Sequence, residues 1–303
     1  MSALLDVGGL AVEVIADQER SSVVRARFGP DLHPEDAVDV RLRIVEGDAR
    51  RPVRSPDARA VDADLWFDGD RRVLARPGVR AERRGREVEI VVEPRGSHDD
   101  GVDLLCQYAV AAAAATPDRA LLHGAALARD DGALVVVGSS GAGKSSLAAA
   151  AWRGGWDLLA DDLVVVRRRE AGGPEVVGVR RPPLLPAELL DDPGDVAELD
   201  ARARRQLPAE VLGRGSRAIR AVVIVGHDDG EGRVGEIDDE ARVAELIHGL
   251  AAPPVAPVLA AHLPVLAALG ELPVLRLLHT ARSDQRAVRA IELLDEVKGR
   301  AGA

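Results

Sequence analysis

A glycine- and serine-rich run, GSSGAGKS, occupies residues 138–145 and has few structural interpretations. The apolar run ALVVV precedes it at residues 133–137, and the helix-prone run SSLAAAAWR follows at residues 145–153. The pattern G-x-x-x-x-G-K-[ST] between a strand and a helix is typical of a loop whose backbone N–H groups surround a polyphosphate. The context therefore predicts a strand, a phosphate-binding loop and a helix within an α/β domain.

The side chains of this loop have different expected roles. Lys144 is expected to reach the β- and γ-phosphates of a nucleotide, and the Ser145 hydroxyl is expected to ligate Mg²⁺. The 40 Lys and Arg residues of the chain include only two lysines, which favours a specific role for the lysine of the loop. A Gly/Ser-rich turn before an ordinary helix is the alternative. The predicted phosphate-binding residues are Gly138, Ser139, Ser140, Gly141, Ala142, Gly143, Lys144, Ser145 and Ser146.

Two adjacent carboxylates, Asp161 and Asp162, lie between the apolar runs WDLLA and LVVV. A strand directly after the loop helix would deliver both to the carboxyl edge of the sheet, where α/β proteins bind ligands. Because adjacent side chains of a regular strand face opposite ways, we expect a strand end or a bend at this point. One carboxylate would then help to hold Mg²⁺, and the other would accept a proton from an attacking hydroxyl. A solvated Asp-Asp turn in a β-hairpin is the alternative.

The chain changes character along its length. Residues 1–100 contain short, often alternating apolar runs divided by turn residues, which predicts a smaller, antiparallel β-rich domain. The run VVRARF at residues 23–28 is one of its expected strands. Residues 101–118 predict a connecting helix that stops near a proline. From residue 119 to residue 303 helical and strand patterns alternate, which predicts an α/β domain.

Composition excludes several classes of function. A net charge of -10 and a pI near 5.3 argue against a surface for nucleic acid or anionic membrane. No apolar run reaches the roughly 18 to 20 residues of a membrane span. Cys106 is the single cysteine, so an intrachain disulfide and a cysteine-rich zinc site are excluded. We therefore expect a cytoplasmic protein without a nucleic-acid or membrane partner.

The stretch LLHGAALARDDGALVVVGSSGAGKSSLAAAAWRGGWDLLADDLVVV, residues 121–166, resembles the catalytic core of the HPr kinase/phosphorylase-like family. The shared features, in order, are a strand with His-Gly, the loop with Gly-Lys-Ser, a helix, and a Leu-Ala-Asp-Asp segment. The resemblance implies an α/β fold: a P-loop catalytic domain of the HPr-kinase/PEP-carboxykinase type, here preceded by the smaller β-rich domain. It also implies ATP, or another nucleoside triphosphate, and Mg²⁺ as cofactors.

The resemblance further implies roles for individual residues. Asp161 would deprotonate a serine hydroxyl, Asp162 and Ser145 would hold Mg²⁺, and Lys144 would contact the phosphates during transfer. His123 would assist near the γ-phosphate, although an isolated histidine among apolar residues is ordinarily a hydrogen-bonded core residue.

The acceptor of the phosphoryl group is less defined. The stretch Arg-Gly-Leu-Gly-Ile-Ile-Asn-Val that HPr kinases carry beyond the paired aspartates is absent from this sequence. The resemblance therefore implies a relative that phosphorylates a serine-type hydroxyl of a protein, a peptide or a small molecule. The residues leave the oligomeric state open, and family relatives include oligomers.

Two classes of function follow from these patterns. The first is an ATP- and Mg²⁺-dependent kinase, in which a carboxylate positions an acceptor hydroxyl for in-line attack. The second is a nucleotide-dependent switch or ATPase that transfers phosphate to no partner. The kinase is favoured because the sequence has neither an N-K-x-D nor an L-S-G-G-Q segment, which the two commonest switch classes carry.

Overall fold

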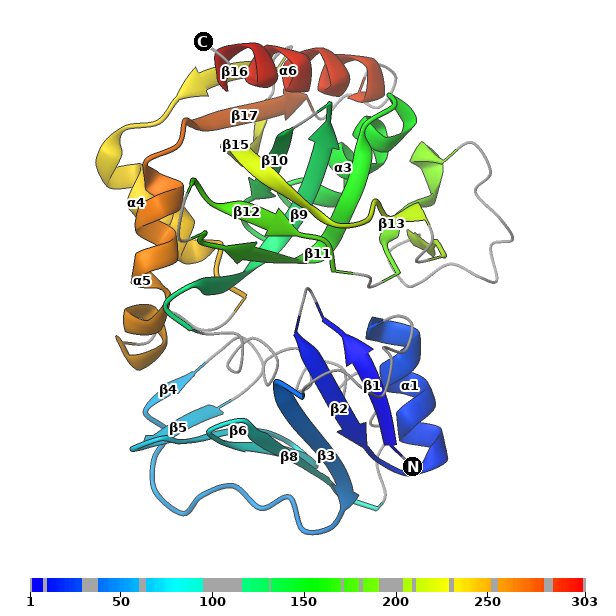
Figure 1. The fold of residues 1–303 in the computed structure, drawn as a ribbon, viewed down its shortest axis with the longest axis vertical. Coiled ribbons are helices and arrows are strands. Elements are labelled where there is room, and N and C mark those ends of the chain that lie inside the picture. The colour runs from blue at the N-terminus through cyan, green and yellow to red at the C-terminus, as the bar shows by residue number, and fades with distance from the viewer. Residues whose placement is uncertain are drawn as a thin grey trace. The chain divides into compact units, whose positions relative to one another are not determined.

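A computed structural model describes most of the chain. The described residues are 2–7, 10–28, 38–59, 64–94, 116–130, 132–169, 172–179, 182–190, 204–208, 211–228, 232–251, 256–280 and 286–301. They fall into two compact units, one of residues up to 115 together with 255–258, and one of the remaining residues from 116 onward. The protein is a mixed α/β protein, and each unit contains one large mixed sheet (Figure 1). The predicted connecting helix at 101–118 lies mainly outside the described residues, which resume at Thr116.

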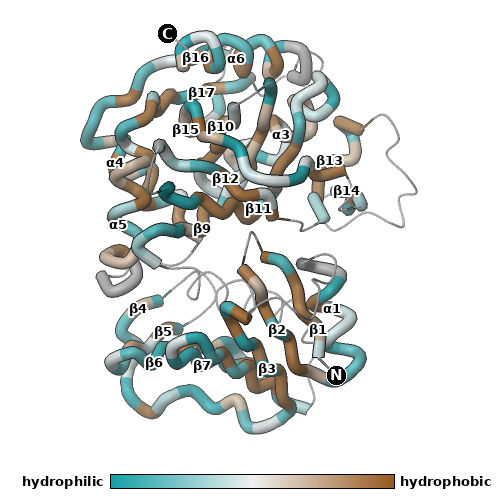
Figure 2. The backbone as a smooth tube through the Cα atoms, in the orientation of Figure 1, coloured by the Kyte–Doolittle hydropathy of each residue, from teal (hydrophilic) through white to brown (hydrophobic). Residues whose placement is uncertain are grey.

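The N-terminal unit is built on an eight-stranded sheet in the order β1-β2-β3-β8-β7-β6-β5-β4. Its strands are β1 (Ser2–Asp6), β2 (Ala11–Ile15), β3 (Val40–Glu46), β4 (Ala58–Arg59), β5 (Asp64–Asp68), β6 (Arg71–Arg76), β7 (Val79–Arg84) and β8 (Glu87–Val92). In Figure 2, β1, β2 and β3 are mostly hydrophobic, whereas β6 and β7 are hydrophilic because of their arginines. The pairs β2–β3 and β3–β8 are parallel, so the predicted antiparallel module is wrong in this part.

The expected strand at 23–28 is also wrong, because helix α1 (Gln18–Phe28) covers these residues. Parallel strands β2 and β3 need a crossover connection, which is usually a helix. The start of the helix is encoded locally: Asp17 Oδ1 accepts a hydrogen bond of 2.9 Å from the Arg20 backbone N–H, as an N-cap residue does. This hydrogen bond lowers the pKa of Asp17. The apolar pair that begins VVRARF suggested a strand, whereas the N-cap that starts the helix, Asp17, lies six residues before Val23.

An Asp17→Ala variant tests this capping. We expect it to lower the free energy of unfolding by about 1 kcal/mol, because one N–H of the first turn loses its acceptor. Urea-induced unfolding followed by circular dichroism measures the change. Asp17→Asn is the matched control, since Asn caps helices as well as Asp does. Equal losses for the two variants would contradict a capping role.

The C-terminal unit is built on a seven-stranded sheet in the order β10-β9-β11-β12-β15-β17-β16. Its strands are β9 (Arg119–Arg129), β10 (Gly132–Val137), β11 (Asp157–Arg167), β12 (Glu175–Val177), β15 (Ser216–Asp228), β16 (Arg233–Glu236) and β17 (Val274–Thr280). Strand β15 also pairs in parallel with β10, so the pairings of β10, β9, β11, β12 and β15 form a closed ring. The predicted turn between two antiparallel strands, β9 and β10, is confirmed.

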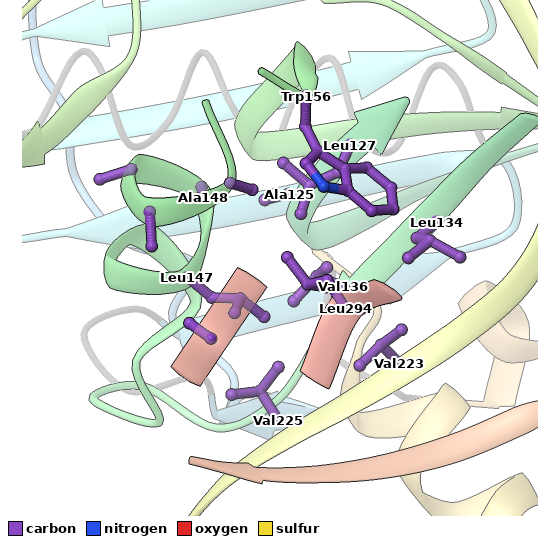
Figure 3. Packing of buried hydrophobic residues seen from close by; sticks show 14 of the residues in the cluster. Ala125, Leu127, Leu134, Val136, Leu147, Ala148, Trp156, Val223, Val225 and Leu294 are labelled. Atoms are coloured by element: carbon purple, nitrogen blue, oxygen red, sulfur yellow. The ribbon is translucent and has the colours of Figure 1, made fainter. Parts of the chain in front are cut away.

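The helices of this unit are α3 (Lys144–Arg153), α4 (Asp239–His248), α5 (Ala256–Gly270) and α6 (Arg286–Ala301). Helices α3 and α6 bury apolar side chains against the sheet, in a cluster that includes Leu147, Leu294, Val136 and Val223 (Figure 3). Alanines fill the side of α3 that packs there, so its backbone can lie close to the strands. This packing holds the start of α3 beside the end of β10.

Smaller elements complete the unit. Strands β13 (Leu184–Pro186) and β14 (Arg204–Gln206) pair antiparallel in a small two-stranded sheet, and a 3-10 turn at Ala187–Leu189 follows β13. No described helix combines the length and the apolar character needed to cross a membrane.

Candidate functional site

The loop at residues 138–143 joins the end of β10 to the start of α3, as the sequence predicts. Two of its glycines have backbone conformations that favour glycine, with φ of 82° at Gly141 and 94° at Gly143. Gly138 is required for a different reason, because a Cβ there would lie 2.7 Å from the Val225 carbonyl oxygen of the neighbouring strand. The glycines thus allow both the turn and its close approach to β15.

The N-terminus of α3 is open to an anion. Gly143 is the N-cap residue and has no side chain with which to cap the helix. The N–H groups of the first turn have no partner within a helix, and the helix dipole places positive potential at this end. Lys144 and Ser145 are the first two residues of the helix. A helix start of this kind is suited to phosphate groups.

Lys144 is 8% exposed and belongs to the same site. Its Nζ donates hydrogen bonds to the carbonyl oxygens of Gly138, at 2.8 Å, and Ser139, at 3.0 Å. Burial lowers the pKa of the Lys144 ammonium, against the opposing effect of the Asp162 and Asp161 carboxylates. A buried ammonium held only by loop carbonyls and nearby carboxylates can exchange these carbonyls for stronger phosphate acceptors.

The register of the sheet brings the paired aspartates to the same level as the loop. Val136 and Val137 of β10 pair with Ala125 and Gly124 of β9. These two residues in turn pair with Asp161 and Asp162 of β11. The aspartates therefore lie two strands away from the point where β10 ends, although β11 continues to Arg167 and no strand end occurs there.

The sequence predicts a strand end or bend at the aspartates; instead, one residue departs from regular strand geometry inside β11, whose pairing with β9 continues past it. Asp162 has a φ of 70°, one of two positive values among the described non-glycine residues. Such a conformation costs on the order of 1 to 3 kcal/mol and persists at functional sites when the surroundings enforce it. Strand β11 continues through both aspartates, so the alternative of an Asp-Asp hairpin turn is wrong.

Asp161 is the buried member of the pair, at 4% exposure. Its Oδ1 accepts a hydrogen bond of 3.3 Å from the Ser145 hydroxyl, and its Oδ2 accepts one of 3.2 Å from the backbone N–H of Leu184. The contact with Ser145 crosses from the strand to the start of α3. This contact links Ser145, the predicted Mg²⁺ ligand, with Asp161, the residue that the family resemblance implies as the proton acceptor.

Asp162 lies beside His123 and is more accessible, with 38% of its side chain exposed. His123 Nδ1 is 3.1 Å from Asp162 Oδ1 and 3.1 Å from the Asp162 carbonyl oxygen. Both contacts are acceptors, so Nδ1 must carry the hydrogen that it shares with them. His123 is therefore a partner of the accessible carboxylate.

The structure brings together the five residues with predicted chemical roles. Ser145 contacts Asp161, and Asp162 contacts His123. Lys144 precedes Ser145 in α3, and its ammonium is affected electrostatically by both aspartates. Ser139, Ser140 and Gly141 form an exposed turn at the loop tip. No set of three or more described His, Cys, Asp or Glu side chains is arranged to hold a metal alone. This is compatible with Mg²⁺, which is usually bound by one or two carboxylates plus substrate phosphates.

Two histidines that contact the loop were not predicted from the sequence. His227 of β15 and His279 of β17 occupy paired positions, and each contacts a carbonyl of the loop. The available signal was weak: each histidine closes an apolar strand, in VVIVGH and VLRLLH. The Leu184 backbone N–H that contacts Asp161 gives no sequence signal, because every residue except proline has one.

Comparison with known proteins gives distant structural similarity to solved structures. No family model and no curated protein matches the chain. Among solved structures, it is similar to the HPr(Ser) kinase/phosphatase from Coxiella burnetii, with 12% identity and a TM-score of 0.31, over 59% of this chain and 98% of that chain. The residues of the site, rather than this similarity, support the function proposed next.

Proposed function

We propose that the C-terminal unit is a Mg²⁺-dependent kinase that transfers the γ-phosphoryl group of ATP, or a similar nucleotide, to a serine-type hydroxyl. The acceptor is a protein, a peptide or a small molecule. The observation that carries the proposal is the contact between Ser145 Oγ and Asp161 Oδ1 at the uncapped start of α3, beside the buried Lys144. Hydroxyl, carboxylate and ammonium groups at one helix N-terminus are the set that a magnesium nucleotide requires.

The residues present fit the two cofactors. The Gly143 cap and the first-turn N–H groups would hold phosphate oxygens, and Lys144 would move its hydrogen bonds from the loop carbonyls to the phosphates. Ser145 and Asp161 would hold Mg²⁺, because phosphate-loop proteins use the loop hydroxyl together with a strand aspartate. The nucleotide supplies the phosphoryl group, and Mg²⁺ neutralises the charge on it.

The contacts favour an assignment of the aspartates opposite to the one implied by family resemblance. Asp161 is buried and bonded to Ser145, where an acceptor hydroxyl would have to displace existing hydrogen bonds. Asp162 is more accessible, with 38% of its side chain exposed, and its carboxylate lies beside His123. We therefore assign proton acceptance to Asp162 and magnesium binding to Asp161. His123 donates its Nδ1–H to Asp162 and orients the carboxylate toward the hydroxyl.

The first experiment tests phosphoryl transfer directly. The protein is incubated with γ-labelled ATP and Mg²⁺ in the presence of free serine, a serine-peptide library or cell extract, beside the Lys144→Ala variant. We expect label on one class of acceptor with the natural chain only. ATP binding without transfer to any acceptor would instead favour a nucleotide-dependent switch or ATPase.

Lys144→Ala is also a binding test. We expect Mg-ATP to bind about 10- to 100-fold more weakly, because a charged hydrogen bond to phosphate is worth about 1.5 to 3 kcal/mol. Calorimetry measures the dissociation constant, and Lys298→Ala is the matched control for loss of a lysine at a distant helix end. Unchanged Mg-ATP affinity in the Lys144 variant would contradict the phosphate-loop assignment.

A further inference from the structure

The backbone carbonyl groups of the 138–143 loop need hydrogen-bond donors. A loop that directs its N–H groups toward phosphates must turn its carbonyl groups the other way, and each carbonyl then needs a donor from elsewhere. Lys144 Nζ satisfies the carbonyls of Gly138 and Ser139, and the Leu147 N–H satisfies that of Gly143. Among the other loop carbonyls, those of Gly141 and Ala142 accept from side chains outside the loop.

Two imidazoles supply these donors. His227 Nε2 lies 2.8 Å from the Gly141 carbonyl oxygen, and His279 Nε2 lies 2.8 Å from the Ala142 carbonyl oxygen. A carbonyl oxygen can only accept, so both rings must carry hydrogen on Nε2. A neutral or a protonated ring meets this requirement equally well.

The sheet fixes the spacing of the two rings. His227 and His279 are directly paired in the parallel register of β15 and β17. Their ring centroids are 4.5 Å apart, in an edge-to-face arrangement with an interplanar angle of 63°. This geometry is favourable for neighbouring aromatic rings, and it presents the two Nε2 atoms to consecutive carbonyls of the loop.

His279 also shapes the loop sterically. It is buried, and its Nε2 would lie only 2.0 Å from a Cβ on Gly143. The N-cap residue of α3 therefore packs directly on the ring that holds the preceding carbonyl. The loop is pressed against His279 at two successive residues, which leaves little freedom for the peptide between them.

We propose that His227 and His279 are positioning residues that hold the 138–143 loop in its phosphate-binding conformation. This inference rests on the proposed function, because it assigns a purpose to the conformation that the histidines maintain. Without the donors, the carbonyls of Gly141 and Ala142 would turn toward water. The Gly143 N–H, in the same peptide as the Ala142 carbonyl, would leave the phosphate side, and the turn closed by the Ala142 N–H and the Ser139 carbonyl would loosen. The apparent affinity for a nucleotide then falls by the fraction of molecules that keep the competent loop.

The test measures Mg-ATP affinity by calorimetry for the full chain and its His279 variants. We expect His279→Leu to weaken binding by about 10-fold, since an unsatisfied buried carbonyl typically carries a penalty of this order. His279→Gln places an amide N–H near the former Nε2, so we expect it to stay within about 3-fold of the natural chain. Rescue by Gln separates a donor role from a general effect of changing a buried side chain.

A second position keeps the inference testable if His279→Leu does not fold. His227 is exposed, so His227→Leu removes the other donor with little effect on packing. We expect a smaller loss, about 3-fold, because water can reach the Gly141 carbonyl in its place. His227→Gln is its control, and urea-induced unfolding shows that the variants remain folded.

The outcomes separate this inference from the proposed function. Natural affinity in both Leu variants, or equal losses in the Leu and Gln variants, would overturn the positioning role. Lys144→Ala serves as the reference in the same experiment. If Lys144→Ala also binds Mg-ATP like the natural chain, the phosphate-loop function itself fails, whereas a loss in Lys144→Ala alone rejects only the histidine pair.

Discussion

An Asp162→Asn variant is expected to bind Mg-ATP with nearly natural affinity and to transfer phosphate about 10² to 10⁴ times more slowly, the usual contribution of a positioned base. The substitution is structurally mild, because Asn tolerates the positive φ of this position as well as Asp does. It keeps an oxygen that can accept from His123 and removes the negative charge that accepts the proton. Single-turnover transfer and calorimetry on the same preparation measure the two effects separately.

Asp161→Asn is the companion variant, and we expect it to impair Mg²⁺ binding rather than proton acceptance. Its amide would place an N–H group near either the Ser145 hydroxyl or the Leu184 N–H, where the natural carboxylate accepts from both. We expect weaker Mg²⁺ binding and partial recovery of transfer when the Mg²⁺ concentration is raised. The reverse result, with intact Mg²⁺ binding in Asp161→Asn and weakened Mg²⁺ binding in Asp162→Asn, would restore the assignment implied by family resemblance.

A Gly143→Ala variant should lose most of its Mg-ATP affinity. The new Cβ would lie 2.0 Å from His279 Nε2, at a φ of 94° that L side chains rarely adopt. Crowding and backbone strain each cost on the order of 1 to 3 kcal/mol, so the loop relaxes out of the binding conformation. We expect affinity to fall by about 100-fold or more, which calorimetry measures directly.

Gly141→Ala is the matched control. Gly141 has a similar φ of 82°, but a Cβ there would meet nothing within 4 Å. This variant carries only the conformational cost, roughly 1 to 2 kcal/mol, so its loss of affinity should be clearly smaller. A double-mutant cycle with His279→Ala adds a second check, because space vacated by the ring should reduce the cost of Ala at 143. Equal losses for the two glycine variants would contradict the contact with His279.

The sequence by itself determined the local pieces of the candidate site. The glycine-rich run that contains Lys144 and Ser145 is compatible with few local structures. The strand, loop and helix occur where that run predicts them. The paired aspartates were predicted to need a bend from the period of a β-strand alone, and the structure places a positive φ at Asp162. Short-range chemistry of this kind depends on neighbouring residues and can be read from them.

Only the tertiary structure decided how these pieces meet. Which aspartate contacts Ser145 depends on the register of β9, β10 and β11. Strands β2 and β3 pair in parallel with helix α1 as their crossover connection, a long-range arrangement that short apolar runs do not specify. His227 and His279 follow the loop residues that they contact by 86 and 137 positions, so these contacts arise from packing between segments that are distant in the chain.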